Sequence, residues 1–115
     1  MKIAIIGSRT LHVDNLEKII PKECTEVVSG GAVGVDTSAE EFARRQGLPI
    51  KRFLPEYDKY GRGAPLIRNK LIVEYADAVY AFWDGKSRGT IHTVKYAREI
   101  GKPVRIFTLK INENG

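Results

Sequence analysis

The chain of 115 residues contains one cysteine, Cys24, and two histidines. A lone cysteine excludes an internal disulfide, a CxxC redox motif and the cysteine spacing of a zinc finger. Neither histidine has a second histidine, a cysteine or a carboxylate at ligand spacing, so we expect no metal site and no cofactor. No pairing of a nucleophile with a base stands out either, so catalytic residues are unknown and enzymatic activity is an open question.

Long apolar runs are also absent. None approaches the ~20 residues that span a membrane, and the opening MKIAIIGSRT is too short for a secretory signal. We therefore expect a cytoplasmic protein without a membrane partner. Because domains commonly contain about 100–150 residues, residues 1–115 are expected to form a single domain.

Acidic residues are outnumbered: 19 Lys and Arg against 14 Asp and Glu give a net charge of +5. This excess favours an anionic partner, but it does not distinguish a small nucleotide from a nucleic acid. A solvated basic surface without a partner is the alternative. Homo-oligomerisation is left open.

Short β-branched runs alternate with helical patterns along the whole chain. Strands are expected at residues 2–6, 25–29, 50–54, 77–82 and 104–107, and helices at 13–20, 35–46, 65–75 and 91–100. Gly47 is expected to cap the second helix, and LKINENG to form a polar tail. The alternation predicts an α/β fold, a small Rossmann-like three-layer sandwich. Its five-stranded, mainly parallel sheet has the order 3-2-1-4-5 and helices on both faces.

The segment before the third helix, YDKYGRGA at residues 57–64, is expected to be a loop. Pro65 then opens the helix, and its spacing predicts that Ile67, Leu71 and Tyr75 face the core. Arg68 would stand in or beside the first turn, where a cation opposes the helix dipole. It either binds an anion, together with the donor and acceptor of Asn69, or extends harmlessly into solvent.

Three loops follow the carboxyl ends of strands, where ligands bind in such sheets. The first contains Gly7, Ser8 and Arg9, the second runs from Gly30 to Asp36, and the third runs from Asp84 to Thr90. Glycine allows backbone N–H groups to approach a phosphate at a helix N-terminus. Tight turns without a ligand are the alternative. Neither a Walker A loop nor a G-x-G-x-x-G fingerprint is present.

Asp36 stands in the first turn of the second helix. It is either a helix-start acid that favours the dipole or an acceptor for a ribose or a base. Tyr57, Tyr60 and Trp83 flank the same edge of the sheet and would either stack on a base or simply pack.

The chain resembles the YspA-like branch of the SLOG superfamily in the order and spacing of VVSGGAVGVDTSAEEFARRQGLPI, GRGAPLIRNKLI and AFWDGKSRGTIHTVKYAREIGKPV. The resemblance runs over nearly the whole chain and implies a Rossmann-like domain that binds nucleotides or their derivatives. Its relatives include the LOG phosphoribohydrolases and the single-stranded DNA binder DprA. The resemblance places Gly89 and Thr90 in a phosphate-binding turn, whereas Thr93 stands where the hydrolases have a catalytic glutamate. That difference argues against hydrolysis.

From these observations we favour a nucleotide or nucleotide-derivative binding domain, acting as a sensor or a subunit. A LOG-like nucleoside-phosphate N-glycosidase or transferase and a DprA-like single-stranded nucleic-acid binder are the alternatives. The expected ligand-binding residues come from the three loops and from the third helix: Gly7, Ser8, Arg9, Gly30, Gly31, Ala32, Gly34, Asp36, Arg68, Asn69, Asp84, Gly85, Arg88, Gly89 and Thr90.

Overall fold

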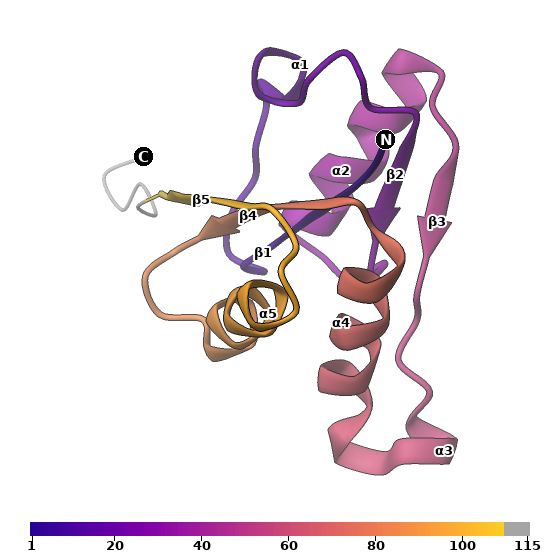
Figure 1. Cartoon of the computed structure of the whole chain (residues 1–115), viewed down its shortest axis with the longest axis vertical. Helices are drawn as coiled ribbons and strands as arrows, with labels where there is room; N and C mark the ends of the chain where they lie inside the picture. Colours follow the sequence, from indigo (N-terminus) through magenta and orange to yellow (C-terminus); the bar gives the residue numbers. More distant parts are fainter. Residues whose placement is uncertain (110–115) are drawn as a thin grey trace.

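The computed structural model describes residues 1–109 and contains a five-stranded sheet in the order β3-β2-β1-β4-β5 (Figure 1). Every neighbouring pair of strands is parallel. The strands are β1 (Lys2–Gly7), β2 (Glu26–Ser29), β3 (Ile50–Arg52), β4 (Ala78–Trp83) and β5 (Val104–Thr108). The predicted fold class and strand order are confirmed. Most of the predicted polar tail, residues 110–115, lies outside the described residues.

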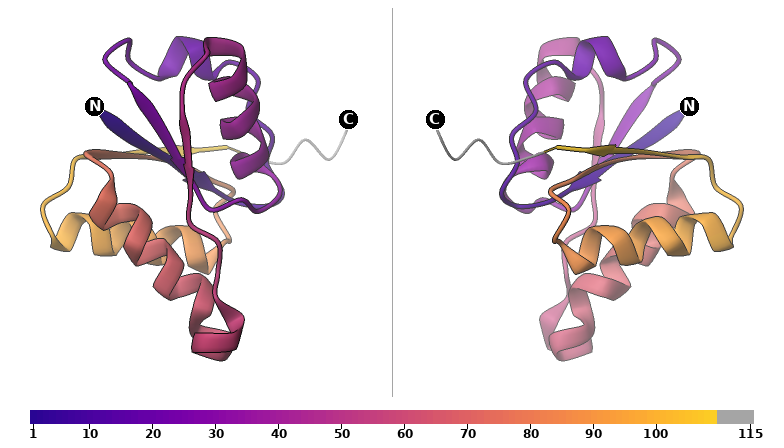
Figure 2. Two further views of the ribbon diagram at one scale, coloured as in Figure 1. Left: turned by 90° about the vertical axis from the view of Figure 1, so that its right-hand side faces the viewer. Right: turned by 90° about the vertical axis from the view of Figure 1, so that its left-hand side faces the viewer.

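Helices cover both faces of the sheet (Figure 2). On one face lie the short α1 (Leu16–Ile19) and α2 (Val35–Gln46), and on the other lie α4 (Ala64–Tyr75) and α5 (Arg88–Glu99). Gly47 ends α2 in the left-handed conformation, with φ of 68°, as its position predicts. In the part of the chain that is described, no helix is both long and apolar enough to span a membrane.

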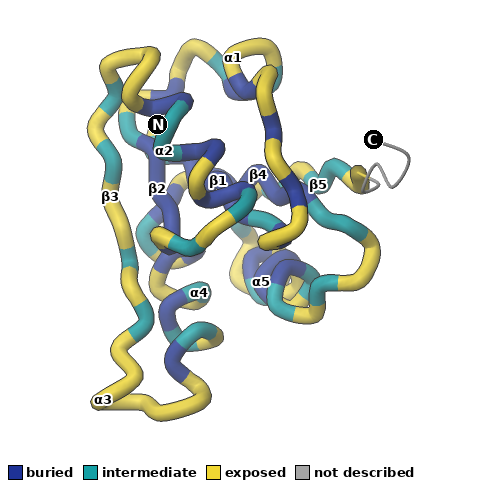
Figure 3. The backbone as a smooth tube through the Cα atoms, turned by 180° about the vertical axis from the view of Figure 1, so that it is seen from behind, coloured by how far each residue is buried: buried dark blue, intermediate teal, exposed yellow. Residues whose placement is uncertain are grey.

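The central strands β1 and β4 are buried along their length, whereas the edge strand β3 is largely exposed (Figure 3). Their side chains alternate between two cores, as parallel strands covered on both faces require. Ile3 and Ile5 pack under α2, and Ala4 and Ile6 pack under α4 and α5. The sheet is therefore a rigid base from which the loops at its carboxyl edge project.

Two predictions for the segment around α4 are wrong. Residues 57–63 are not an irregular loop, since α3 (Tyr57–Tyr60) and a 3-10 turn (Gly61–Gly63) precede α4. Leu71 is 44% exposed, while Ile72 and Val73 are buried in its place. Apolar residues occur on every side of this helix, so its periodicity does not select a face. Contacts with β1, β2 and β4 select it, and they turn Arg68 inward.

Candidate functional site

A cleft of about 360 Å³ opens at the carboxyl edge of the sheet, between the loops that follow β1, β2 and β4 and the first turns of α4 and α5. It lies beside the predicted switch point, which falls between β1 and β4. From β1 the strand order runs to β2 and β3 on one side and to β4 and β5 on the other. Its lining residues are Ile6, Gly7, Arg9, Thr10, Ala32, Asp36, Pro65, Arg68, Asn69, Ile72, Asp84, Ser87, Gly89, Thr90 and Thr93.

The predicted residues divide into two groups. Those that line the cleft are Gly7, Arg9, Ala32, Asp36, Arg68, Asn69, Asp84, Gly89 and Thr90. Those that stand outside its lining are Ser8, Gly30, Gly31, Gly34, Gly85 and Arg88. Sequence reasoning missed Ile6, Thr10, Pro65 and Ile72 as lining residues. Ser87, in the predicted third loop, and Thr93, which the resemblance placed at the site, also line the cleft but were not among the expected ligand-binding residues. Helical spacing carried a signal for some of these, because Pro65 and Ile72 lie one turn from Arg68, and Thr93 lies one turn from Thr90.

Three of the glycines are required by protein neighbours. A side-chain carbon on Gly7 would collide with the Phe82 carbonyl oxygen, and one on Gly34 would lie 2.5 Å from the Arg9 carbonyl oxygen. Gly34 also has a φ of 77°, which side-chain-bearing residues rarely adopt. A side-chain carbon on Gly30 would lie 2.5 Å from Arg68 Nη1. These glycines therefore clear space for other parts of the chain.

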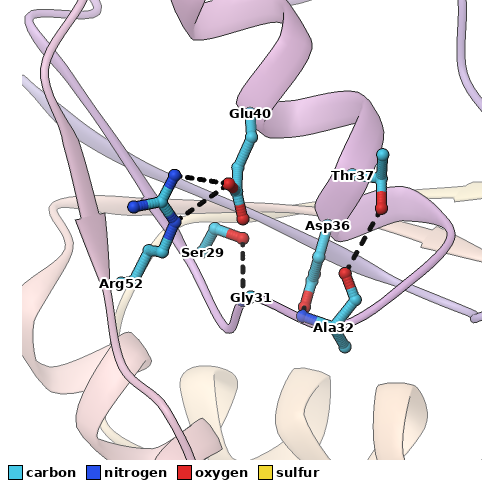
Figure 4. Close-up of polar contacts among 7 residues, drawn as sticks. All are labelled: Ser29, Gly31, Ala32, Asp36, Thr37, Glu40 and Arg52. Atoms are coloured by element: carbon cyan, nitrogen blue, oxygen red, sulfur yellow. Dashed lines mark hydrogen bonds and ion pairs between the residues drawn. The ribbon is translucent and has the colours of Figure 1, made fainter.

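The loop before α2 uses some of its own N–H groups internally (Figure 4). The Ala32 N–H donates to Asp36 Oδ2 at 3.0 Å, and the Gly31 N–H donates to Ser29 Oγ at 3.3 Å. Burial of the Asp36 carboxyl raises its pKa above the ordinary value, against the lowering effects of the Ala32 N–H and of Arg68. The Asp36 carboxylate thus accepts the Ala32 N–H, one of the donors that were expected to bind an anion.

Arg68 is the main basic group in the cleft. It is 8% exposed, and its Nη1 donates to the Gly30 carbonyl oxygen at 2.7 Å. Its Nε is fully buried and has no acceptor among the described residues. Burial lowers the pKa of Arg68, while the nearby Asp36 raises it without forming a direct ion pair. A buried donor without an acceptor costs about 1–3 kcal/mol, and a ligand cannot offset this cost because protein atoms enclose Nε. Nη2 also has no acceptor among the described residues but is not enclosed, so a ligand in the cleft would meet the guanidinium there.

The loop before α5 is organised by a carboxylate at its base. Asp84 Oδ1 accepts from the N–H groups of Lys86 and Ser87, both at 2.8 Å, and Oδ2 accepts from Thr10 Oγ1 at 2.8 Å. These donors, the Lys86 N–H first, lower the pKa of Asp84 to about 2. The carboxylate therefore stays ionised at neutral pH and fixes the entry into the helix.

Beyond Asp84, the first turn of α5 remains open. Ser87 Oγ caps the N–H of Thr90 at 3.3 Å, but within residues 1–109 the N–H groups of Arg88 and Gly89 have no acceptor. A side-chain carbon on Gly89 would meet nothing within 4 Å. Unlike Gly7, Gly30 and Gly34, this glycine faces empty space in the cleft. A ligand can approach the helix N-terminus there.

The formal charges of the lining balance. Arg9 and Arg68 contribute two positive charges, and Asp36 and Asp84 contribute two negative charges when ionised. Both oxygens of Asp84 have protein donors, whereas among residues 1–109 only Oδ2 of Asp36 has one. The cleft therefore offers donors on the side of Arg68 and α5, and one free carboxylate oxygen on the side of α2. A ligand with an anionic group and a separate hydroxyl or amino donor matches this arrangement.

A Ser–His–Asp arrangement lies outside the cleft. His12 Nδ1 is 3.1 Å from Ser38 Oγ, and His12 Nε2 is 2.8 Å from Asp14 Oδ1. Ser38 is 1% exposed, and its Oγ already accepts from the Val13 N–H at 2.9 Å. A substrate cannot reach that hydroxyl, so this cluster fixes the loop against α2 and is not a nucleophile with its base. Within the described residues, no group of acidic, histidine or cysteine side chains is arranged to hold a metal ion.

Comparison with known proteins finds one relative that is similar in sequence and two solved structures that are similar in fold. No family model matches the chain. The Gene 61 protein of Mycobacterium phage D29 is 34% identical over 87 residues, which cover 70% of each protein. DNA processing protein A (DprA) from Streptococcus pneumoniae superimposes with a TM-score of 0.73 and 22% identity, over 97% of this chain and 52% of that protein.

The Helicobacter pylori DNA processing protein A, studied for its single-stranded DNA binding mode, superimposes with a TM-score of 0.71 and 24% identity. The match covers 98% of this chain and 67% of that protein. This chain thus spans about half the length of the pneumococcal protein. The likeness concerns the fold, which is that of DprA.

Proposed function

This chain belongs to the same family as the Gene 61 protein of Mycobacterium phage D29, and we propose that it binds single-stranded nucleic acid, with one phosphate of the strand held in the cleft beside Arg68. The observation that carries the proposal is the buried Arg68 guanidinium, which lines the cleft and whose Nη2 has no acceptor among the described residues. Burying a cation is unfavourable unless an anion or a hydrogen-bond acceptor compensates it. Gly30 supplies one acceptor and Asp36 lies nearby, which leaves Nη2 for a ligand, because Nε is enclosed by protein atoms.

A phosphate satisfies this requirement best. Its oxygens accept charge-assisted hydrogen bonds from arginine, often two at once. The N–H group of Gly89, at the positive end of α5, supplies a further donor on the same cleft, and the N–H of Arg88 lies next to it in the chain. Asn69 and Thr90 add side-chain donors to its lining.

Three observations favour a strand over a free nucleotide. The two solved structures compared above are both DNA processing proteins, and one is described by its binding of single-stranded DNA. The chain carries a net charge of +5, and Lys86 and Arg88 are exposed on the loop that borders the cleft. Exposed cations beside a phosphate pocket suit a polymer whose neighbouring phosphates need compensation.

A free nucleotide or nucleotide derivative is the second candidate. It is favoured by the recessed shape of the cleft, whose volume of about 360 Å³ is within the range of small-ligand pockets. The free oxygen of Asp36 would then accept from the ribose or the base.

As part of the same proposal, we infer that residues 1–115 form one domain of the YspA-like branch of the SLOG superfamily.

The two candidates are separated by calorimetric titration with thymidine 5′-monophosphate and with a dT ten-mer at several salt concentrations. For the strand, the logarithm of affinity should fall by about 0.7 per phosphate contact for each tenfold rise in salt. Arg68→Ala should weaken binding of the ten-mer roughly 10- to 100-fold, as expected for charge-assisted hydrogen bonds. Arg98→Ala, on the exposed far end of α5, is the matched control and should bind nearly as the wild type does.

Thermal unfolding of both variants identifies any loss of binding that comes from misfolding. Salt-insensitive binding of the mononucleotide, without measurable binding of the ten-mer, would move the second candidate to first place. Indifference of both ligands to Arg68→Ala would contradict the phosphate site itself.

A further inference from the structure

A second cavity, of about 310 Å³, lies on the other side of Arg68 from the cleft. It is formed where the segment between β3 and α3 runs alongside α4 (Figure 1, Figure 2). We call it the α3–α4 groove and define it by Leu54, Tyr60, Ile67, Arg68 and Leu71, which line it. We propose that this groove is a second nucleotide subsite, in which Tyr60 and its apolar neighbours hold the base next to the phosphate bound by Arg68. The inference rests on the proposed binding of a strand.

The groove is lined by apolar side chains that are exposed to solvent, and this exposure does not stabilise the fold. Leu54, Tyr60 and Leu71 are exposed large hydrophobic residues, and all three line the groove. Contiguous exposed apolar surface with a polar rim marks a binding site more often than chance exposure. Here the rim consists of Arg52, Glu56 and Arg68.

Arg68 links the two cavities, because it is a lining residue of both of them. A phosphate bound to its guanidinium in the cleft is therefore only about one side chain away from the groove. In a nucleic acid, each phosphate joins two nucleosides. If one nucleoside occupies the cleft, the other is directed toward the groove.

The size of the groove selects a base over a protein partner. A cavity of about 310 Å³ accommodates a group of the size of one nucleoside. Stable protein interfaces of standard size instead bury about 1,200–2,000 Å² in total, which needs contacts well beyond this groove. Aromatic side chains such as Tyr60 stack on any of the bases, and an apolar floor takes the other face of the ring. Lys59, whose Nζ lies 5.2 Å from the centre of the Tyr60 ring, adds a positive charge close to the strand.

The test compares thymidine 5′-monophosphate with the 5′-phosphorylated thymidine dinucleotide by calorimetry at one salt concentration. The wild type should bind the dinucleotide more tightly. Tyr60→Ala should weaken dinucleotide binding roughly 5- to 100-fold, the effect expected for one stacked base, and should leave binding of the mononucleotide unchanged. Tyr60→Phe, which keeps the ring, should behave as the wild type does.

Leu66 and Leu71 provide a matched pair on α4. They are 41% and 44% exposed, but only Leu71 lines the groove. Leu71→Ala should weaken dinucleotide binding, by a smaller factor than Tyr60→Ala, whereas Leu66→Ala should not. Both positions are exposed, so neither change should unfold the protein, and circular dichroism melts check this.

Three results would overturn the inference, and they are distinguishable. If Tyr60→Ala and Leu71→Ala bind the dinucleotide as the wild type does while Arg68→Ala does not, the groove is not a subsite and the phosphate site stands. If Arg68→Ala also binds normally, both proposals fail. If Leu71→Ala changes the sedimentation coefficient without changing nucleotide binding, the groove is a surface for self-association.

Discussion

The two glycine-rich loops at the carboxyl edge of the sheet differ in what their glycines face. In the loop before α2, Gly30 and Gly34 lie against Arg68 and the Arg9 backbone. In the loop before α5, Gly89 faces open space in the cleft. The first loop also donates N–H groups to Ser29 and Asp36 within itself, whereas the N–H groups of Arg88 and Gly89 have no acceptor in the described part of the chain.

This difference assigns separate tasks to two loops of similar composition. The loop before α2 is a scaffold that gives the Arg68 guanidinium room and an acceptor, the Gly30 carbonyl oxygen. The loop before α5 leaves donors and space for a ligand. A glycine is therefore informative about binding only where no protein atom needs the space that it leaves.

The largest effect on stability is expected for Gly34→Ala in the first loop. The new side chain would collide with the Arg9 backbone and would require a φ of 77° from alanine. Overpacking and backbone strain each cost about 1–3 kcal/mol, so the free energy of unfolding should fall by about 2–6 kcal/mol. Urea denaturation measures it. Gly89→Ala is the control and should be neutral or slightly stabilising. Equal losses for both variants would remove the distinction between the loops.

Gly89→Val should abolish ligand binding while the unliganded protein stays folded. The added methyl groups would fill the open space in the first turn of α5 and keep a phosphate from its N–H groups. A ligand at a hundred times its dissociation constant stabilises a protein by about 2.7 kcal/mol, and the variant should lose that stabilisation. Thermal shift with the dT ten-mer measures it. A wild-type shift in Gly89→Val would show that the ligand does not approach this turn.

A smaller effect is expected when the pH changes, and the stability contributed by Asp84 and by Asp36 should change in opposite directions. Asp84 has its pKa lowered to about 2, so its stabilisation is complete above the ordinary aspartate pKa and is lost as the pH falls toward 2. Asp36 has its pKa raised by burial, so its contribution is most favourable at low pH and is lost as the pH rises through the raised value. Urea denaturation at several pH values measures both.

The substitution to asparagine tests each carboxyl. Asp84→Asn should be less sensitive than the wild type to acid below about pH 4, the ordinary aspartate pKa. Asp36→Asn should remove the loss of stability that accompanies the rise in pH. The same pH profile for both variants would contradict the different environments of the two carboxyls.

The smallest effect is expected for the hydrolysis of nucleoside monophosphates, which this protein should not catalyse. Cleavage of a nucleoside monophosphate into base and ribose phosphate builds positive charge on the sugar, which a nearby carboxylate would stabilise. In α5, Thr93 stands where the resemblance to the LOG phosphoribohydrolases places their catalytic glutamate, and its Oγ1 donates to the Gly89 carbonyl oxygen at 2.8 Å. Incubation with AMP, CMP, GMP and UMP should release no free base by chromatography. Release at roughly 1 per second or faster, an ordinary enzymatic rate, would make the protein an enzyme.

The sheet, the position of the cleft and the end of α2 were predictable, because they depend on local sequence patterns. Alternating β-branched runs and helical faces determined five parallel strands and their order, since right-handed crossovers leave few other arrangements. The same topology placed the loops after β1, β2 and β4 at one edge, which located the cleft. Gly47 capped α2 as predicted, because a helix end is specified by residues within a few positions of it.

What the sequence did not determine depends on atoms far apart along the chain. It marked Gly7, Gly30, Gly34 and Gly89 alike as missing side chains, and only the fold shows that Phe82, Arg68 and Arg9 occupy the space at the first three. The face of α4 was likewise decided by the sheet, because that helix has apolar residues on every side. The burial of Arg68 follows from that choice of face. A one-dimensional pattern records which side chains are present or absent, whereas tertiary packing decides what fills the space beside them.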